Sequence, residues 1–67
     1  MGELVFDVRQ DADGGFVAEA LGEDIFTEAE SWDALCVRVR DAVSAYFFDG
    51  EGPQRLRLRL VRDEVLA

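Results

Sequence analysis

The stretch ELVFDVRQDADGGFVAEAL, residues 3–21, decides the fold because it contains two alternating segments joined by a turn. In residues 3–10 and again in residues 16–21, every second side chain is small or apolar. Side chains of a strand point to alternate faces, so this period predicts two strands with one buried face each. The inward residues would be Leu4, Phe6 and Val8 in the first strand and Phe16, Ala18 and Ala20 in the second.

The connecting segment DADGG, residues 11–15, has the composition of a hairpin turn but also resembles a calcium-binding loop. A helix-loop-helix calcium site needs oxygen ligands at its first and last positions and a glycine at its centre. With Gly14 at the centre, the first position falls on Arg9 and the last on Ala20. The flanking segments also have the period of strands. We therefore predict a hairpin turn here and no metal site.

A different period begins at Ser31, where apolar residues recur at three- and four-residue spacing. This spacing predicts an amphipathic helix that starts after Ser31 as N-cap, with Thr27 and Glu30 as an alternative capping box four residues earlier. We expect the helix to stop near Phe48, with Gly50 as its C-terminal cap. Its apolar face would comprise Trp32, Leu35, Cys36, Val39, Ala42, Val43, Tyr46 and Phe47.

Two further strands complete the chain. A short strand is expected at residues 25–27 after a turn at LGED, and QRLRLRLV, residues 54–61, alternates leucine with arginine. The order of elements predicts one α+β domain over residues 1–67, with a two-layer β-β-β-α-β fold. We expect an antiparallel sheet with the single amphipathic helix packed on one face, which leaves the other face of the sheet open.

The composition argues against chemistry carried out by this chain. The 67 residues include no histidine, and Cys36, the single cysteine, falls on the predicted apolar face of the helix. Imidazole and paired thiols are the usual groups of general-base catalysis and zinc sites, so we expect no enzymatic activity and no cofactor. The chain starts without the basic and apolar blocks of a signal peptide and contains no membrane-length apolar run. We expect a cytoplasmic protein.

A chain this short buries a small core and usually requires a disulfide, a metal or a second subunit for stability. Because the first two are not expected, we predict a homodimer. Val65 and Leu66, near the end of the sequence, are apolar residues without an obvious use in a two-layer domain, and we predict that they form the dimer contact.

The charge is large and unevenly distributed. The net charge is −8, and residues 1–33 hold ten acidic residues and one arginine, whereas residues 34–67 hold five acidic residues and six arginines. Such a chain repels phosphate backbones and attracts basic proteins. The predicted partner surface comprises Asp11, Asp13, Glu19, Glu23, Asp24 and Glu28.

An arginine row on the last strand offers an alternative function, since basic residues on one strand face can contact nucleic acid. The row comprises Arg55, Arg57, Arg59 and Arg62. Asp7 and Glu19 should lie on the same open sheet face, however, and cross-strand ion pairs account for the row more simply. A third hypothesis is a metal-dependent hydrolase built on the acidic loop.

Several motifs together resemble the HicB-like domain of bacterial and archaeal toxin–antitoxin systems. The first is the hairpin DGGFVA, and the second is a TEAxSWxxL segment that leads into the helix. A closing arginine–leucine strand follows. The residues that carry the resemblance are Asp13, Gly14, Gly15, Phe16, Val17, Ala18, Thr27, Glu28, Ala29, Ser31, Trp32 and Leu35.

The resemblance implies a dimeric or larger β-β-β-α-β protein that binds and neutralises a small basic RNA-cleaving toxin, HicA. Typical members continue into a DNA-binding segment, and this sequence stops at Ala67 without one, so DNA binding is not implied. The family's hairpin between the second and third strands is shortened here to LGED. We therefore expect a non-enzymatic protein-interaction module of the short, solitary HicB-like branch, with an antitoxin-like role.

Overall fold

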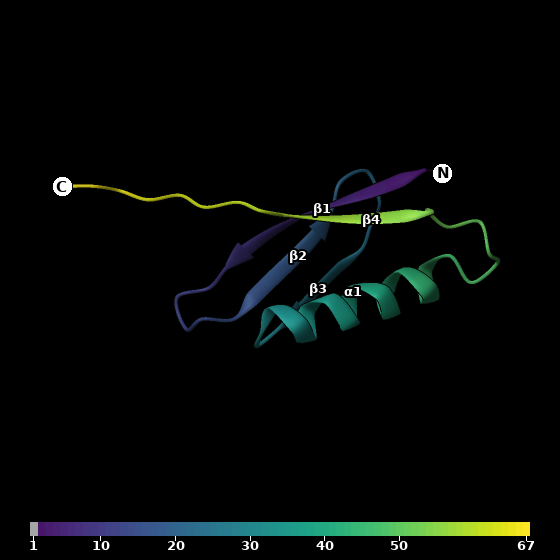
Figure 1. The fold of residues 1–67 in the computed structure, drawn as a ribbon, viewed down its shortest axis with the longest axis horizontal. Coiled ribbons are helices and arrows are strands. Elements are labelled where there is room, and N and C mark those ends of the chain that lie inside the picture. Colours follow the sequence, from purple (N-terminus) through teal and green to yellow (C-terminus); the bar gives the residue numbers. More distant parts are fainter. Residues whose placement is uncertain (1) are drawn as a thin grey trace.

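The computed structural model describes residues 2–67 and contains four strands and one helix (Figure 1). The strands form one sheet in the order β3-β2-β1-β4, and the helix crosses one face of it. This is the predicted two-layer α+β arrangement with the predicted order of elements. The elements are β1 (Glu3–Gln10), β2 (Phe16–Ala20), β3 (Phe26–Ala29), α1 (Trp32–Tyr46) and β4 (Arg55–Leu60).

The sheet is mixed, so the prediction of a fully antiparallel sheet was wrong for one strand pair. β2 is antiparallel to both β1 and β3, but β4 is parallel to β1. A parallel partner requires a crossover connection, and α1 provides it by returning the chain to the end of the sheet where β3 began. β4 therefore runs in the same direction as β3 and pairs at the opposite edge of the sheet.

The segment between β1 and β2 is a hairpin turn, as predicted. The Asp11 N–H donates to the Gly15 carbonyl at 2.7 Å, and the Gly14 N–H donates to the Asp11 carbonyl at 3.0 Å. Gly14 has φ of 93°, a left-handed conformation that costs a residue with a Cβ about 1–2 kcal/mol. The glycine is therefore required by the turn itself.

The helix begins as the sequence predicts, because the Ser31 hydroxyl accepts a hydrogen bond from the Ala34 N–H at 3.1 Å. Its C-terminal end differs slightly from the prediction. The helix ends at Tyr46 with Phe47 as C-cap, and Gly50, with φ of 83°, lies in the following turn. No helix within residues 2–67 has the length and apolar content needed to cross a bilayer.

The third strand lies slightly later in the chain than predicted. Residues 25–27 were expected, whereas the sheet pairing covers Phe26–Ala29. The difference arises because the pairing with β2 extends to Ala29, which lies opposite Phe16. Ile25 precedes the strand and packs into the core instead.

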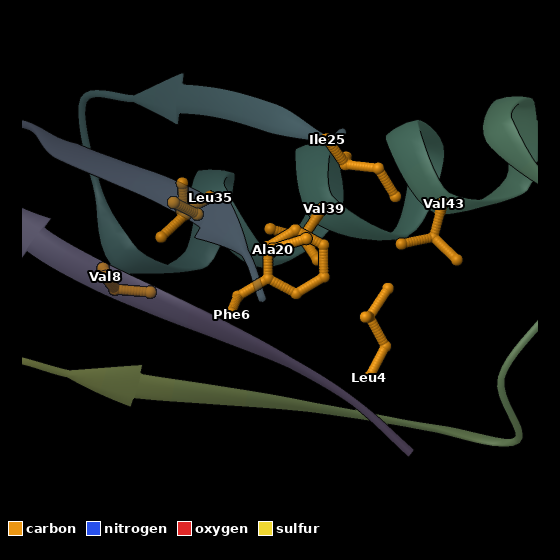
Figure 2. Close-up of a cluster of buried hydrophobic side chains, with 9 residues drawn as sticks. Leu4, Phe6, Val8, Ala20, Ile25, Leu35, Val39 and Val43 are labelled. Carbon is orange, nitrogen blue, oxygen red and sulfur yellow. The ribbon is translucent and has the colours of Figure 1, made fainter. Parts of the chain in front are cut away.

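The core lies between α1 and the inner face of β1 and β2, and Figure 2 shows its side chains converging on Phe6. The prediction for β1 is confirmed, since its inward residues are the most completely buried of any strand. The predicted helix face was too wide: Trp32 and Tyr46 are 37% and 45% exposed. The buried residues are Leu4, Phe6, Val8, Ala18, Ala20, Ile25, Leu35, Val39 and Val43.

Candidate functional site

A concave surface lies where the β1–β2 hairpin, the end of β3 and the first half of α1 meet. Its volume is about 580 Å³. We call it the acidic hollow, because acidic side chains dominate the residues that line it. These residues are Asp11, Asp13, Gly15, Phe16, Glu28, Ala29, Glu30, Ala34 and Arg38.

The acidic hollow carries a net negative charge. Four acidic residues and one arginine line it, which gives these residues a net charge of −3. All five charged residues are solvent-exposed, so each is accessible to a ligand. The guanidinium of Arg38 forms no ion pair with any residue of the described chain, 2–67. The surface therefore attracts cationic groups, most strongly at low ionic strength.

The hairpin fixes the carboxylate that lies at its tip. Asp13 Oδ1 accepts a hydrogen bond from the Gly15 N–H at 3.2 Å, and Gln10 Nε2 donates to the Gly14 carbonyl at 3.2 Å. Asp13 therefore stabilises the turn and also contributes a negative charge to the acidic hollow. The backbone around it is held before any ligand arrives, which lowers the entropy lost on binding.

An apolar wall borders the carboxylates. The ring of Phe16 lines the acidic hollow and meets Trp32 edge to face, with 5.6 Å between ring centroids. Ala29 and Ala34 extend the same apolar lining. A lysine or arginine side chain has an aliphatic stem and a charged head. It therefore suits a surface on which an apolar area borders an acidic one.

The structure brings together only half of the predicted partner surface. Asp11, Asp13 and Glu28 line the acidic hollow. Glu23 and Asp24 lie in the β2–β3 turn, at the opposite end of the sheet from the hairpin. The remaining member, Glu19, is exposed and pairs in register with Asp7 on the open face of the sheet.

Sequence reasoning missed two charged residues of the acidic hollow, Glu30 and Arg38. Glu30 stands immediately before the helix cap, where an acidic side chain reaches the start of the helix. Arg38 lies one helical turn after Ala34 and therefore on the same flank of α1. Their spacing was visible in the sequence, but the packing of α1 beside β3 was not.

The arginine row is engaged by carboxylates of the neighbouring strand. Nε and Nη2 of Arg57 donate to the two carboxylate oxygens of Glu3, both at 3.1 Å. Arg55 Nη2 lies 3.6 Å from the same carboxylate. Arg59 contacts Asp7 through Nε at 2.9 Å and through Nη2 at 2.8 Å. The predicted cross-strand ion pairs are confirmed, with Glu3 rather than Glu19 as the second acid.

The ion pairs follow from the parallel register of β1 and β4. Glu3 lies opposite Arg55, and Asp7 lies opposite Arg59, on the open face. The Arg57 hydrogen bond lowers the pKa of Glu3 below its usual value, against an opposing effect of desolvation. The same hydrogen bond raises the pKa of Arg57. The fourth arginine, Arg62, lies beyond β4, and its Nη2 is 3.9 Å from Glu64.

The carboxylates of the acidic hollow do not form a recognisable metal centre. Within residues 2–67 there is no group of three or more His, Cys, Asp or Glu side chains placed to hold a metal ion. Cys36, a free cysteine, is half-buried. It lies in a separate groove on the other flank of α1.

Two known proteins are similar to this chain over most of its length. A UPF0150 protein of Thermotoga maritima is 32% identical over 65 residues, which cover 97% of this chain and 91% of that protein. The chain belongs to the UPF0150 family. A UPF0150 protein of Archaeoglobus fulgidus is 44% identical over 45 residues, or 67% of this chain and 68% of that protein.

Other comparisons leave the function of this UPF0150 protein open. No family model matches the chain, and no solved structure matches it. The names of the two UPF0150 relatives state no activity, ligand or partner. The HicB-like assignment predicted from the motifs is not among these matches.

Proposed function

We propose that this UPF0150 protein is a non-enzymatic protein-interaction module whose acidic hollow receives basic side chains of a partner protein. The observation that carries the proposal is that Asp11, Asp13, Glu28 and Glu30 all line one concave surface of about 580 Å³. Two segments far apart in the sequence supply these four acidic residues: the β1–β2 hairpin, and the end of β3 with the link that follows it. An arrangement of this kind concentrates negative charge where an arginine or lysine can enter.

The shape and chemistry of the acidic hollow favour arginine over a free metal ion or a nucleic acid. A guanidinium can bind a carboxylate through two parallel hydrogen bonds, and its stem can pack on the apolar wall formed by Phe16 and Ala29. A phosphate backbone would be repelled by the same carboxylates. Arg38, which also lines the hollow, repels a second cation.

The resemblance to HicB-like antitoxins suggests what kind of partner this is. Typical members of that family bind a small basic RNA-cleaving toxin, and an acidic surface is complementary to such a protein. We therefore propose an antitoxin-like role in a cytoplasmic setting. The hairpin DGGFVA, which carries part of the resemblance, also forms one wall of the acidic hollow.

The absence of catalytic activity is part of the proposal. The sequence contains no histidine, so the hydroxyl and thiol groups of the chain have no imidazole base to activate them. The cysteine lies in the groove on the far flank of α1 rather than beside the carboxylates. These features support a protein that acts through its shape and charge.

Binding of a fluorescein-labelled peptide rich in arginine, followed by anisotropy at two salt concentrations, tests the proposal. Asp13→Asn retains an oxygen for the turn hydrogen bond but removes the charge, and Glu30→Gln removes a second one. We expect the double variant to bind about tenfold more weakly, because two charge-assisted contacts are lost. Trp32, which contacts the Phe16 ring, provides a second, intrinsic fluorescence signal.

A charge-matched control distinguishes a specific site from general attraction. Glu23→Gln with Asp24→Asn removes the same two charges at the opposite end of the sheet, and we expect nearly unchanged binding. Equal losses in the two double variants would show that only the net charge matters and would refute the site. A salt-sensitive gel shift that Arg57→Gln abolishes would instead support the nucleic-acid alternative.

A further inference from the structure

An apolar groove runs between α1 and β4, on the opposite flank of the helix from the acidic hollow. It arises because the helix lies closest to β3 and β2 and leaves the leucine row of β4 only half covered. The groove has a volume of about 250 Å³. The residues that line this α1/β4 groove are Trp32, Cys36, Val39, Arg40, Leu56 and Leu58.

Beyond Val61, the segment that follows β4 forms no hydrogen bond with the rest of the described chain, residues 2–67. The Val61 N–H still donates to the Val8 carbonyl at 2.7 Å, and the chain then leaves the sheet. Figure 1 shows residues 62–67 running away from the sheet as an extended arm. Val65 and Leu66 in this arm are 96% and 82% exposed. These two apolar side chains are therefore largely exposed to water.

The arm and the α1/β4 groove of the same chain are poorly placed to meet. The Val61 hydrogen bond carries the direction of β4 past the end of the sheet, whereas the groove lies behind that point, beside Leu56 and Leu58. A return would require a tight reversal within residues 62–64. This segment, Arg-Asp-Glu, contains neither glycine nor proline, the two strongest turn formers.

We propose that two copies of this chain dock by exchanging arms, with the arm of each copy lying in the α1/β4 groove of the other. Residues 61–67 span roughly 20 Å when extended, which suffices to lie along a neighbouring helix. Val65 and Leu66 would pack against Trp32 and the half-covered leucines. A two-fold arrangement makes each contact twice, so both apolar surfaces are covered at once.

The charges of the two surfaces are complementary. Arg40 lies at the rim of the α1/β4 groove, is exposed, and forms no ion pair with another residue of the described part, 2–67. The arm carries Asp63 and Glu64 directly before its apolar residues. Either carboxylate can pair with Arg40 of the other copy once the apolar residues are seated, which selects this groove over other apolar patches.

Arm exchange leaves the proposed partner site free. Ala34 and Arg38 face the acidic hollow, whereas Cys36 and Arg40 face the α1/β4 groove, on the two flanks of the buried helix stripe. A dimer of this kind therefore presents two acidic hollows. A monomeric variant that still binds the basic peptide would separate this inference from the proposed function.

Sedimentation equilibrium of the full chain at micromolar concentration tests the inference. We expect twice the 7.5 kDa chain mass for the natural sequence. Leu66→Asp should raise the dissociation constant by at least about tenfold, because it places a charge in an apolar contact at the centre of the interface. Phe48→Asp, the same kind of change at a residue that is 88% exposed outside the arm, should leave the mass unchanged.

Charge reversal and cross-linking then identify the groove. Arg40→Glu should weaken the dimer, and adding Asp63→Arg with Glu64→Arg should restore it. Because Cys36 is the only cysteine, Leu66→Cys should form an intermolecular disulfide with it under oxidised glutathione, whereas Phe48→Cys should not. A monomeric natural chain, a disulfide within one chain, or a dimer unaffected by Leu66→Asp would each overturn the inference.

Discussion

β1 and β4 lie side by side with the same alternating pattern, yet they differ greatly in burial. Their inward residues are in register, with Leu4 beside Leu56, Phe6 beside Leu58 and Val8 beside Leu60. The β1 residues are at most 3% exposed, whereas Leu60 is 46% exposed. Alternation therefore determines which face of the sheet a side chain occupies, but the position of the helix determines whether that side chain is covered.

The largest effect is expected for Phe6→Ala, at the centre of the covered region. Phe6 is fully buried, and removal of a buried phenylalanine typically costs about 3–5 kcal/mol. A core this small seldom supplies more than about 3–5 kcal/mol of net stability. We expect the variant to be largely unfolded by far-ultraviolet circular dichroism at 25 °C. A cooperative urea transition at the natural midpoint would contradict the central role of β1.

A matched pair of leucine variants measures the contrast between the two strands directly. Leu4→Ala should lower the free energy of unfolding by about 2–5 kcal/mol, because Leu4 is 3% exposed. Leu60→Ala removes the same atoms from a half-exposed position and should cost roughly 1 kcal/mol. Urea unfolding in a Leu66→Asp background excludes contributions from self-association. Equal losses would show that β4 is as well covered as β1.

Loss of the helix cap tests how firmly α1 is held over the covered region. Ser31→Ala removes the hydroxyl that accepts from the Ala34 N–H and should cost about 1 kcal/mol. Amide exchange should accelerate in the first turn of α1 and much less in β4. Ser31→Asp, which retains an acceptor oxygen, should keep nearly the full stability. If the alanine variant were equally stable, the cap would not contribute to the position of the helix.

The smallest effect is expected at the ion pairs that join β1 to β4 on the open face. The Arg57 hydrogen bond lowers the pKa of Glu3 in the folded state, so folding favours its ionised form. This contribution is present above the unfolded-state pKa, near 4.5, and is lost as the pH falls through the lower folded-state pKa. The natural chain and the Glu3→Gln variant should therefore differ slightly in the midpoint of urea unfolding at pH 7. Their midpoints should converge in acid. A difference that persists below both pKa values would exclude the ion pair as its cause.

Local signals in the sequence identified most of the elements. The period of two in residues 3–10, the DADGG turn and the Ser31 cap each depend on neighbours within a few residues, and all three are present in the structure. The direction of β4 was predicted wrongly. Strand direction depends on which end of the sheet a crossover helix reaches, and the alternation in Arg55–Leu60 is the same for both directions.

Three of the five charged residues of the acidic hollow could also be predicted from the sequence. Asp11, Asp13 and Glu28 belong to an acidic half of the chain that is evident from composition. Their selection from the other carboxylates was not evident, because Glu23 and Asp24 have the same chemistry and lie in the other turn. Spatial grouping of charges depends on the folded path of the chain, which brings the hairpin next to the end of β3.

The sequence by itself determined the strands, the helix, the turn and the excess of negative charge, because these depend on side-chain chemistry and on spacing along the chain. Only the tertiary structure decided that β4 is parallel, that its leucines remain half covered and that four acidic residues line one hollow. These features follow from how the helix lies across the sheet. That position is set by packing between residues far apart in the chain, such as Phe6 and Val39, and no local pattern shows which inward-facing residues will meet.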